Sequence, residues 1–308
     1  MAHCHAGAFS GLKVLTVCAS LGRMRRVSTK RELRAAVTAS GKGPRVLVPT
    51  MGALHEGHAT LLRRAREIAG SDGTVVASVF LNPTQFDNAG DFSAYPRTPE
   101  QDMNICEACG VDILFMPDPA EMYRQDRSVC VEEHSLANVL CGASRPGHFA
   151  GVCLVVTKLF NLVQPTDAVF GKKDYQQLAI LRRLVRDLDF PIMLHGVDTV
   201  REKDGLAVSS RNVRLTAQQR SAAPGIYAGL LAAKAAYARS ESAEAICSAL
   251  RESLTAIPDV KVDYIELVDA ETLNPAQSTP SPRTLLLAVA AWFGEVRLID
   301  NIELPPLS

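Results

Sequence analysis

Two histidines three residues apart, His55 and His58, lie in the stretch VPTMGALHEGHATLL, residues 48–62. A short apolar run precedes them, and glycines stand on both sides. The chain is expected to turn after that run and to enter a helix near Gly57, which places both imidazoles at a helix N-terminus. Backbone N–H donors and the positive end of the helix dipole collect at such a position, so it suits an anion such as a phosphate.

Metal binding and simple capping are the alternatives for this histidine pair. The helix of zinc proteases places its histidines at i and i+4 with a glutamate between them. This chain has a spacing of i and i+3 with Gly57 between. An ordinary capping or solvated role is the usual interpretation of a single histidine. Two histidines with two glycines at one strand-to-helix turn favour the phosphate interpretation.

The elements that must position the pair alternate along the chain. Apolar runs such as VVASVF predict strands at 45–50, 74–82, 111–117, 167–171 and 192–200. Helical patterns lie between them at 29–38, 58–70, in the segment that ends at Cys109, and at 151–164 and 174–188. This alternation predicts parallel βαβ units with helices on both faces of the sheet. Ligands of such sheets bind beyond the carboxyl ends of the strands, where the histidines lie.

The pattern changes beyond about Val200. Alanine-rich helices are predicted at 222–238 and 243–257, and strands at 261–270, 283–293 and 295–304 are expected to pack on them. We therefore expect a Rossmann-like α/β domain at residues 24–199 and a smaller α+β domain at residues 200–308. Residues 1–23 read as an extension that is disordered or not translated, with Met24 as the alternative start. A signal peptide is the competing interpretation, which Lys13 argues against.

Charge and cysteine usage narrow the class of protein. Lys plus Arg balance Asp plus Glu at 33 each in 308 residues, so no net field marks the chain for nucleic acid or an anionic membrane. No apolar run approaches the roughly 20 residues that span a bilayer. Eight dispersed cysteines form no disulfide framework, which favours a reducing cytoplasm. Cys106 and Cys109 have zinc-like or redox-like spacing, but they read as the end of a helix stopped by Gly110, and a structural zinc site needs four ligands.

Longer motifs resemble a known family. His-x-Gly-His after the first strand of an α/β domain is similar to the first signature of the nucleotidyltransferase superfamily that includes class I aminoacyl-tRNA synthetases. The strings PTMGALHEGH, LNPTQF, DFSAYPRT, RPGHFAGV, FGKKDYQQL and DGLAVSSRN follow one another in order. Together they closely resemble the pantoate-β-alanine ligase (pantothenate synthetase) family, from about Met24 to the C-terminus.

The resemblance implies a two-step ligation. Pantoate's carboxylate attacks the α-phosphate of ATP, giving pantoyl adenylate and pyrophosphate, and β-alanine's amine then attacks the acyl carbon to give pantothenate and AMP. Donors fixed around the phosphorus stabilise that transition state. The implied catalytic residues are His55, His58, Lys173, Ser209, Ser210 and Arg211, with His58 as the proton donor. The same six residues are implied to bind ATP, together with Met51, Gly52, Gly171, Lys172, Asp174, Val200 and Val208.

Several assignments within this nucleotide site stay open at the level of the sequence. Spacing alone does not choose between Lys172 and Lys173, and a solvated loop lysine is the alternative for either; the resemblance points to Lys173. The string from Val208 to Arg211 corresponds to the superfamily's second signature, a loop that closes over the triphosphate. Val208 departs from the Met or Leu expected there, which affects the fit of the nucleotide rather than a catalytic group.

A pantoate pocket should combine apolar walls with a few neutral hydrogen-bonding groups. Gln85 and Gln177 match the family's two pantoate-binding glutamines, and an amide both donates and accepts. For Gln177, a helix surface position next to Gln176 is the alternative. The further pocket candidates, for pantoate and β-alanine, are Met51, Asn82, Tyr95, Arg145 and His148. Arg145 and His148 either reach the site or stabilise its loop.

The resemblance also implies a metal, a closed site and an assembly. Mg²⁺ would be bound mainly by phosphate oxygens, with Asp102 as the candidate protein ligand through water. The C-terminal domain is expected to act as a lid that excludes water from the mixed anhydride. A homodimer is the implied assembly.

Two other functions remain as alternatives. A plain nucleotidyltransferase that acts on a phosphate acceptor would use the same histidines and serine loop, but it would need clustered Arg or Lys in place of Gln85 and Gln177. A noncatalytic nucleotide-binding module is the third hypothesis, which the complete set of charged and hydroxyl groups argues against.

Overall fold

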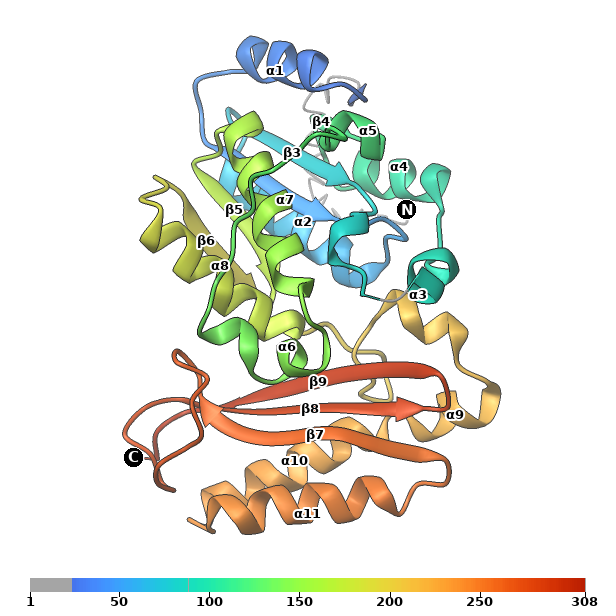
Figure 1. The fold of residues 1–308 in the computed structure, drawn as a ribbon, viewed down its shortest axis with the longest axis vertical. Helices are drawn as coiled ribbons and strands as arrows, with labels where there is room; N and C mark the ends of the chain where they lie inside the picture. Colours follow the sequence, from blue (N-terminus) through green and yellow to red (C-terminus); the bar gives the residue numbers. More distant parts are fainter. Residues whose placement is uncertain (1–23, 88, 308) are drawn as a thin grey trace, which may run out of the picture.

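The computed structural model describes residues 24–87 and 89–307, so the predicted extension at residues 1–23 lies outside the described part of the chain. Six parallel strands form the central sheet in the order β1-β4-β3-β2-β5-β6 (Figure 1). They are β1 (Arg25–Val27), β2 (Arg45–Thr50), β3 (Thr74–Val79), β4 (Ile113–Phe115), β5 (Asp167–Gly171) and β6 (Met193–Val197). All but β1 were predicted. The missed strand, RRV, is three residues long and two of them are exposed, so it carries no apolar run.

Helices cover both faces of this sheet, as the continuous apolar strands predicted. Alternate residues of a strand point to opposite faces. Leu47 of β2 therefore joins one core, while Val46 and Val48 join the other, and all three are fully buried. The first core is covered by α1 (Lys30–Ala39), α7 (His148–Val163) and α8 (Tyr175–Asp187), and the second by α2 (Glu56–Ala69) and α4 (Pro99–Ala108).

The strand order reverses between β2 and β5. From β2 the chain proceeds through β3 to β4, and it later returns on the other side of β2 to form β5 and β6. The segments that follow β2 and β5 therefore diverge at one point on the carboxyl edge of the sheet. Open α/β sheets bind ligands at such a switch point.

Short helices occupy segments in which the sequence predicted no separate helix. None of them exceeds six residues, too short for helical periodicity to be visible in the sequence. They are η1 (Pro83–Gln85), α3 (Ala89–Ala94), α5 (Pro119–Met122), η2 (Leu136–Asn138), α6 (Cys141–Ser144), η3 (Lys172–Asp174), η4 (Ser210–Arg214) and α9 (Ala217–Ala222).

A smaller antiparallel sheet follows, with strand order β7-β8-β9, and it is formed by the three strands predicted for this part of the chain. Leu285, Leu287 and Val289 of β8 pack on the helices beneath the sheet, whereas Leu286 and Ala288 point the other way and join the core of the parallel sheet. The elements are α10 (Gly225–Ala238), α11 (Ala243–Thr255), β7 (Val260–Asp269), β8 (Leu285–Phe293) and β9 (Val296–Leu304). The upper face of the small sheet thus closes the bottom of the parallel-sheet half (Figure 1). A domain boundary near residues 199 to 200 stays a prediction.

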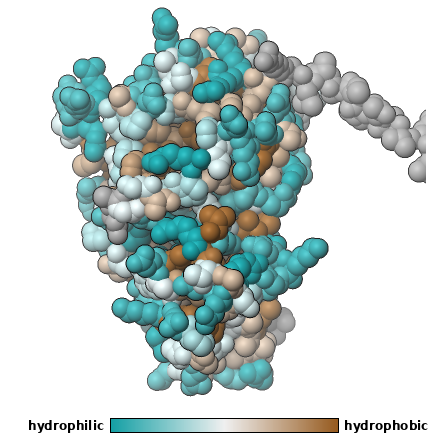
Figure 2. All heavy atoms as spheres, turned by 90° about the vertical axis from the view of Figure 1, so that its right-hand side faces the viewer, coloured by the Kyte–Doolittle hydropathy of each residue, from teal (hydrophilic) through white to brown (hydrophobic). Residues whose placement is uncertain are grey.

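The surface that carries α3 and α9 is largely hydrophilic, and apolar residues gather at about mid-height, the level at which the two halves meet (Figure 2). Among the described residues, no helix is both long and apolar enough to cross a bilayer.

Candidate active site

The turn after β2 is held from below by one buried carboxylate. Gly52 has φ +90° and Ala53 φ +51°, so the chain turns sharply here. Asp102, which is 1 % exposed, accepts hydrogen bonds from the backbone N–H of Ala53 (3.1 Å) and Leu54 (2.7 Å). Its Oδ1 also accepts one from the Thr98 hydroxyl (3.0 Å). These bonds fix the entry into α2.

The two histidines lie at the N-terminus of that helix, as the sequence predicted. His55 is the N-cap of α2, and its Nδ1 accepts a hydrogen bond from the Gly57 N–H (3.2 Å). The Nδ1 of His58 accepts one from the His55 N–H (3.3 Å). Because each Nδ1 accepts, the proton of each neutral imidazole lies on Nε2. Both rings line a cavity of about 220 Å³ at this edge of the sheet, which we call the site cavity. Their centroids are 4.1 Å apart, so they offer two Nε2–H donors to a ligand.

Both imidazoles are neutral near pH 7. Burial, together with the charge of Lys173, lowers the pKa of His55 to about 4. Burial and the neighbouring His55 lower the pKa of His58 to about 3. A ring with so low a pKa carries no second proton to give at neutral pH. This neutral form suits hydrogen-bond donation from Nε2, and the proton donation predicted for His58 stays a prediction.

The segment after β5 supplies a cation. The chain leaves β5 at Gly171, forms η3 and enters α8, so that Gly171, Lys173, Asp174 and Gln177 all line the cavity. Burial alone would raise the pKa of Asp174, but Lys173 and Arg211 lower it below its usual value. The carboxylate is therefore ionised and complements the two cations.

The structure distinguishes the neighbours Lys172 and Lys173, and likewise Gln176 and Gln177, which spacing in the sequence did not. The Nζ of Lys172 lies 2.9 Å from an Asp198 carboxylate oxygen and 2.8 Å from one of Glu303, and the residue does not line the cavity. The amide of Gln176 is buried and bonds to the backbone of Leu136, Val139 and Cys141. These contacts leave Lys173 and Gln177 as the residues that reach the site.

The segment from Val208 to Arg211, the serine loop, forms another part of the cavity wall. The Val208 N–H donates to the Val200 carbonyl (2.9 Å), which brings both residues to the cavity. Ser209 Oγ accepts from the Arg211 N–H (3.2 Å) and begins η4. The Ser210 hydroxyl donates to the hydroxyl of Tyr95 (3.2 Å). Ser209, Ser210 and Arg211 all line the cavity.

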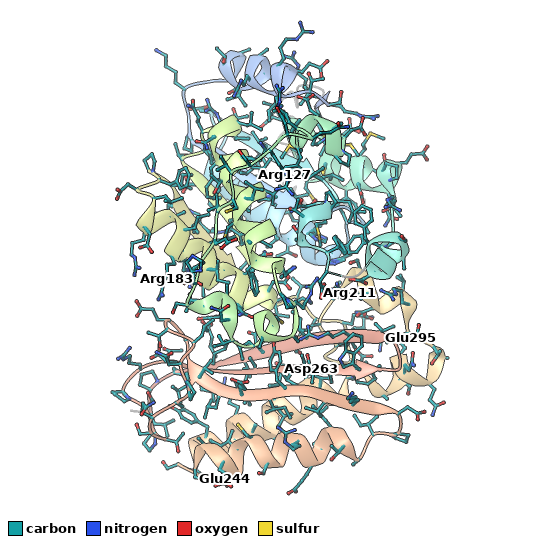
Figure 3. All side chains as sticks on the ribbon, in the orientation of Figure 1. Arg127, Arg183, Arg211, Glu244, Asp263 and Glu295 are labelled. Carbon is teal, nitrogen blue, oxygen red and sulfur yellow. The ribbon has the colours of Figure 1, made fainter. Side chains whose placement is uncertain are left out.

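Asp91, which was not among the predicted site residues, binds the two arginines of η4. Arg211 and Arg214 donate to its carboxylate at 3.0 and 2.9 Å. Burial opposes its ionisation, but the two guanidiniums hold the pKa of Asp91 below its usual value. Figure 3 shows Arg211 between the parallel-sheet half and the small sheet that carries Asp263. Asp91 lies in the string DFSAYPRT, but no spacing within it points to a partner about 120 residues away.

Gln85 lines the cavity, and its side-chain amide is held by two partners. Its side chain is 7 % exposed; Oε1 accepts from Asn82 Nδ2 (2.9 Å), and Nε2 donates to Met51 Sδ (3.0 Å). Asn82 also donates to the Gly151 carbonyl (3.1 Å), and its own oxygen accepts from Thr84 and Tyr123. Asn82 therefore lines the cavity but acts as a support for Gln85.

Arg145 and His148 both reach the site and support the segment around Gln85, the two roles that the sequence left open. Both line the cavity, and both bind the backbone carbonyl of Gln85. Because a carbonyl only accepts, His148 Nδ1 donates to it at 2.7 Å, and His148 Nε2 accepts from Arg145 at 3.3 Å. Burial and Arg145 lower the pKa of His148 to about 4, consistent with this neutral form.

The cavity gathers predicted residues from six separate segments at the switch point. Its volume is about 220 Å³. A larger cavity of about 710 Å³, between this site and the small sheet, adjoins it and shares six of its wall residues. The chemically suited residues concentrate in the smaller cavity, and the larger one extends it toward the C-terminal half. The predicted residues that line the smaller cavity are Met51, His55, His58, Asn82, Gln85, Tyr95, Arg145, His148, Gly171, Lys173, Asp174, Gln177, Val200, Val208, Ser209, Ser210 and Arg211.

Gly52, Lys172 and Asp102 do not line it. Gly52 provides the turn, because a Cβ there would stand 3.1 Å from an Asp102 oxygen. The described residues contain no cluster of three or more His, Cys, Asp or Glu side chains arranged to hold a metal ion. Both oxygens of Asp102 are occupied by the turn, so its geometry does not fit the metal role that was predicted for it. Asp174 and Asp198 are the carboxylates of the described cavity wall.

Comparisons with known proteins agree on one family. Residues 24–303 match the family described as pantoate-beta-alanine ligase. The chain is 54 % identical to a pantothenate synthetase of Akkermansia muciniphila, over 91 % of this chain and 100 % of that protein. It is 51 % identical to a pantothenate synthetase of Solidesulfovibrio magneticus, over 89 % of this chain and 95 % of that protein.

Solved structures of the same name are similar as well. The pantothenate synthetase of Thermus thermophilus has a TM-score of 0.85 and 46 % identity, covering 92 % of this chain and 100 % of that one. The pantoate-beta-alanine ligase of Francisella tularensis, described as complexed with beta-gamma ATP and beta-alanine, has a TM-score of 0.74 and 31 % identity. That match covers 91 % of this chain and 97 % of the other.

Proposed function

This chain belongs to the pantoate-β-alanine ligase family, and we propose which of its residues carry each half of the ligation. The enzyme joins pantoate to β-alanine at the expense of ATP, through pantoyl adenylate, and releases AMP and pyrophosphate. Family membership decides against the two alternatives, a transferase acting on a phosphate acceptor and a noncatalytic binder. The observation that carries the residue assignments is the convergence of six segments on one cavity at the β2–β5 switch point.

In the first half-reaction, the histidine pair donates two hydrogen bonds from Nε2 to phosphate oxygens. Both rings are held by backbone N–H groups on their other nitrogen, so no reorganisation is needed as charge develops on the phosphorus. Neutral donors in a buried site also avoid the cost of desolvating two imidazolium ions.

Cations complete the phosphate site. Lys173 lies on the β5 side of the cavity and Arg211 on the side of the serine loop, so the polyphosphate would bind between them. Arg211 forms an ion pair with Asp91. A phosphate therefore competes with Asp91 for this guanidinium, and the Ser209 and Ser210 hydroxyls lie close by to donate as well. The walls at Val200 and Val208 are proposed to contact adenine.

Pantoate would bind at the other end, between Gln85 and Gln177. The Gln85 amide is oriented by Asn82 and Met51, while the Met51 side chain supplies apolar wall. Neutral amides suit a hydroxyl and a carboxylate that must remain nucleophilic, because a tightly paired cation would lower the reactivity of the carboxylate. Tyr95, Arg145 and His148 close this end.

In the second half-reaction, β-alanine attacks the acyl carbon, and water must be kept away from the mixed anhydride. We propose that the β7–β9 sheet acts as the lid and that residues 200–308 form the corresponding domain. Support comes from the larger cavity, which lies between that sheet and the site. It offers the amine an approach from the C-terminal side.

Magnesium is proposed as the metal that accompanies ATP. It would neutralise charge on the phosphates and be held mainly by their oxygens, with Asp174 and Asp198 as the nearby carboxylates of the described wall. Such a donor set fits an ion that brings most of its ligands with the nucleotide. Asp102 is not retained in this role.

A cytoplasmic homodimer is the proposed form of the enzyme. The six cysteines within the described residues are free thiols, which suits a reducing compartment. The dimer rests on the family resemblance alone, and sedimentation of the purified protein tests it directly.

Product analysis tests the proposed function. The protein is incubated with ATP, Mg²⁺ and pantoate, with and without β-alanine, and pyrophosphate, AMP and pantothenate are followed separately. We expect pyrophosphate to require pantoate, and pantothenate with AMP to appear in quantity only when β-alanine is added. Folded protein that releases no pantoate-dependent pyrophosphate would refute the assignment of this cavity as the adenylating site.

A further inference from the structure

Strand β9 of the small sheet contacts two segments of the nucleotide site. Asp300 accepts hydrogen bonds from two guanidinium nitrogens of Arg201, at 2.6 and 2.9 Å. Arg201 directly follows Val200 of the cavity wall. Glu303 accepts from Lys172 Nζ (2.8 Å) and from the Tyr175 hydroxyl (3.1 Å). The side chain of Asn301 points to the same region, and its contacts differ in kind.

The Asn301 amide binds backbone, not side chains. Its Nδ2 donates to the carbonyl of Lys172 at 3.0 Å and to that of Lys173 at 2.9 Å, and the residue is 8 % exposed. One NH₂ group has two N–H donors, and both are used by these two acceptors. The two carbonyls belong to the peptide groups on either side of the Lys173 Cα. Holding both peptide planes sets the direction in which the Lys173 side chain leaves the backbone.

The residues at the two ends of this segment add no side-chain cap to it. Gly171, the N-cap of η3, and Asp174, the N-cap of α8, make no side-chain capping bond. The Lys173 ammonium is 3.7 Å from the Asp174 carboxylate, a long ion pair. Its direction therefore depends on the backbone, and the backbone is held by a residue 128 positions further along the chain.

We propose that Asn301 is a positioning residue for the adenylation step, which keeps the Lys173 ammonium directed at the phosphates of ATP. The inference rests on the proposed role of Lys173. It makes the C-terminal half a contributor to the first half-reaction in addition to its role as a lid. A merely structural Asn301 would join the two halves of the chain, as Asp300 and Glu303 do.

Two variants and one matched control separate these roles. Asn301→Ala removes both donors. Asn301→Asp keeps the shape but turns a charged acceptor toward two carbonyls, and it serves if the alanine variant does not fold. Glu303→Gln, on the same strand, removes the ion pair with Lys172 and leaves the Asn301 contacts intact. Thermal melting establishes that each variant is folded.

Both half-reactions are then measured separately. Pyrophosphate release from ATP and pantoate reports adenylation, and aminolysis of added synthetic pantoyl adenylate by β-alanine reports the second step. For Asn301→Ala we expect adenylation at least tenfold slower than wild type and aminolysis within twofold of it, while Glu303→Gln stays within threefold in both. Adenylation within twofold of wild type in Asn301→Ala, or an equal loss in both half-reactions, would overturn the proposal.

A double variant tests the link to Lys173 itself. If Asn301 acts through Lys173, adding Asn301→Ala to Lys173→Ala produces no further loss of adenylation. A further tenfold loss in the double variant contradicts the inference and leaves the role of Lys173 standing. A Lys173→Ala variant that adenylates at the wild-type rate refutes the assignment of Lys173, and with it the inference that depends on it.

Discussion

Replacement of Asp102 by asparagine separates a structural role from a metal role. The carboxylate accepts three hydrogen bonds, from the Ala53 and Leu54 N–H groups and the Thr98 hydroxyl. An asparagine of the same shape keeps its oxygen toward Leu54 and Thr98. Its NH₂ group must then meet the Ala53 N–H, donor against donor. The turn that carries His55 is the part of the site that would move.

The structure sets the size of the effect. The substitution removes one hydrogen bond to a charged acceptor, worth about 1.5–3 kcal/mol, and leaves a buried N–H unsatisfied, which costs about 1–3 kcal/mol. Because these terms overlap, we expect the free energy of unfolding to fall by about 2–4 kcal/mol. For a chain of this size, at about 2 °C per kcal/mol, this lowers Tm by about 4–8 °C.

Thermal and urea unfolding of Asp102→Asn measure the loss in the free energy of unfolding. The Mg²⁺ dependence of pyrophosphate release tests the competing role of Asp102 as a magnesium ligand. Glu100→Gln is the matched control, since it removes the same charge from an exposed position in the first turn of the same helix. The control should lie within about 0.5 kcal/mol of wild type. Unchanged stability in Asp102→Asn, with a several-fold higher Mg²⁺ requirement, would refute the structural role.

Three further outcomes follow from the site. His58→Ala should slow pyrophosphate release by about 10²–10³-fold, the cost of one preorganised donor, in protein that still folds; near-normal turnover would remove His58 from the site. Gln85→Ala should raise the KM for pantoate about tenfold, the loss of about one hydrogen bond, and leave that for ATP within twofold; an unchanged pantoate KM would place the acceptor pocket elsewhere. Folding lowers the pKa values of His58 and His148 to about 3 and 4. As the pH falls below about 6.5, these two imidazoles therefore bind protons in the unfolded chain before they do so in the folded chain. Stability should therefore decrease between pH 6.5 and 4, with each histidine adding about 1.4 kcal/mol per pH unit to the slope. In a urea-unfolding series across this range, His148→Gln should show a shallower slope than wild type, and an identical slope would contradict the neutral state of this ring.

Short sequence patterns predicted the parts of the site that depend only on neighbouring residues, namely the strands and the histidine pair. The strands β2, β3 and β5 are continuous apolar runs buried on both faces, and their ends fix the switch point. The histidine pair follows one of those ends, where the N-terminus of a helix is implied by the glycines around it. The family motifs then supplied residues, such as those of the serine loop, that spacing alone does not distinguish from an ordinary polar loop.

Contacts between distant segments account for what the sequence did not predict. Lys172 and Lys173 are equivalent by spacing, and the partners Asp198 and Glu303 decide which of them leaves the site. Asp102 reads as an acidic residue near the site, but its partners are backbone N–H groups of a turn about 50 residues earlier. Asn301 lies in a strand whose pattern predicts only packing. Such pairings are properties of the folded chain and have no local signature.

Transfer of oxygen from pantoate to AMP tests the central claim, that this site activates pantoate by adenylation. Pantoate labelled with ¹⁸O in its carboxylate is converted with ATP and β-alanine, and the AMP is examined by mass spectrometry. Attack of the carboxylate on the α-phosphate predicts that each AMP carries one labelled oxygen, because the acyl C–O bond breaks when the amine attacks. AMP without label, formed together with pantothenate, would contradict the account.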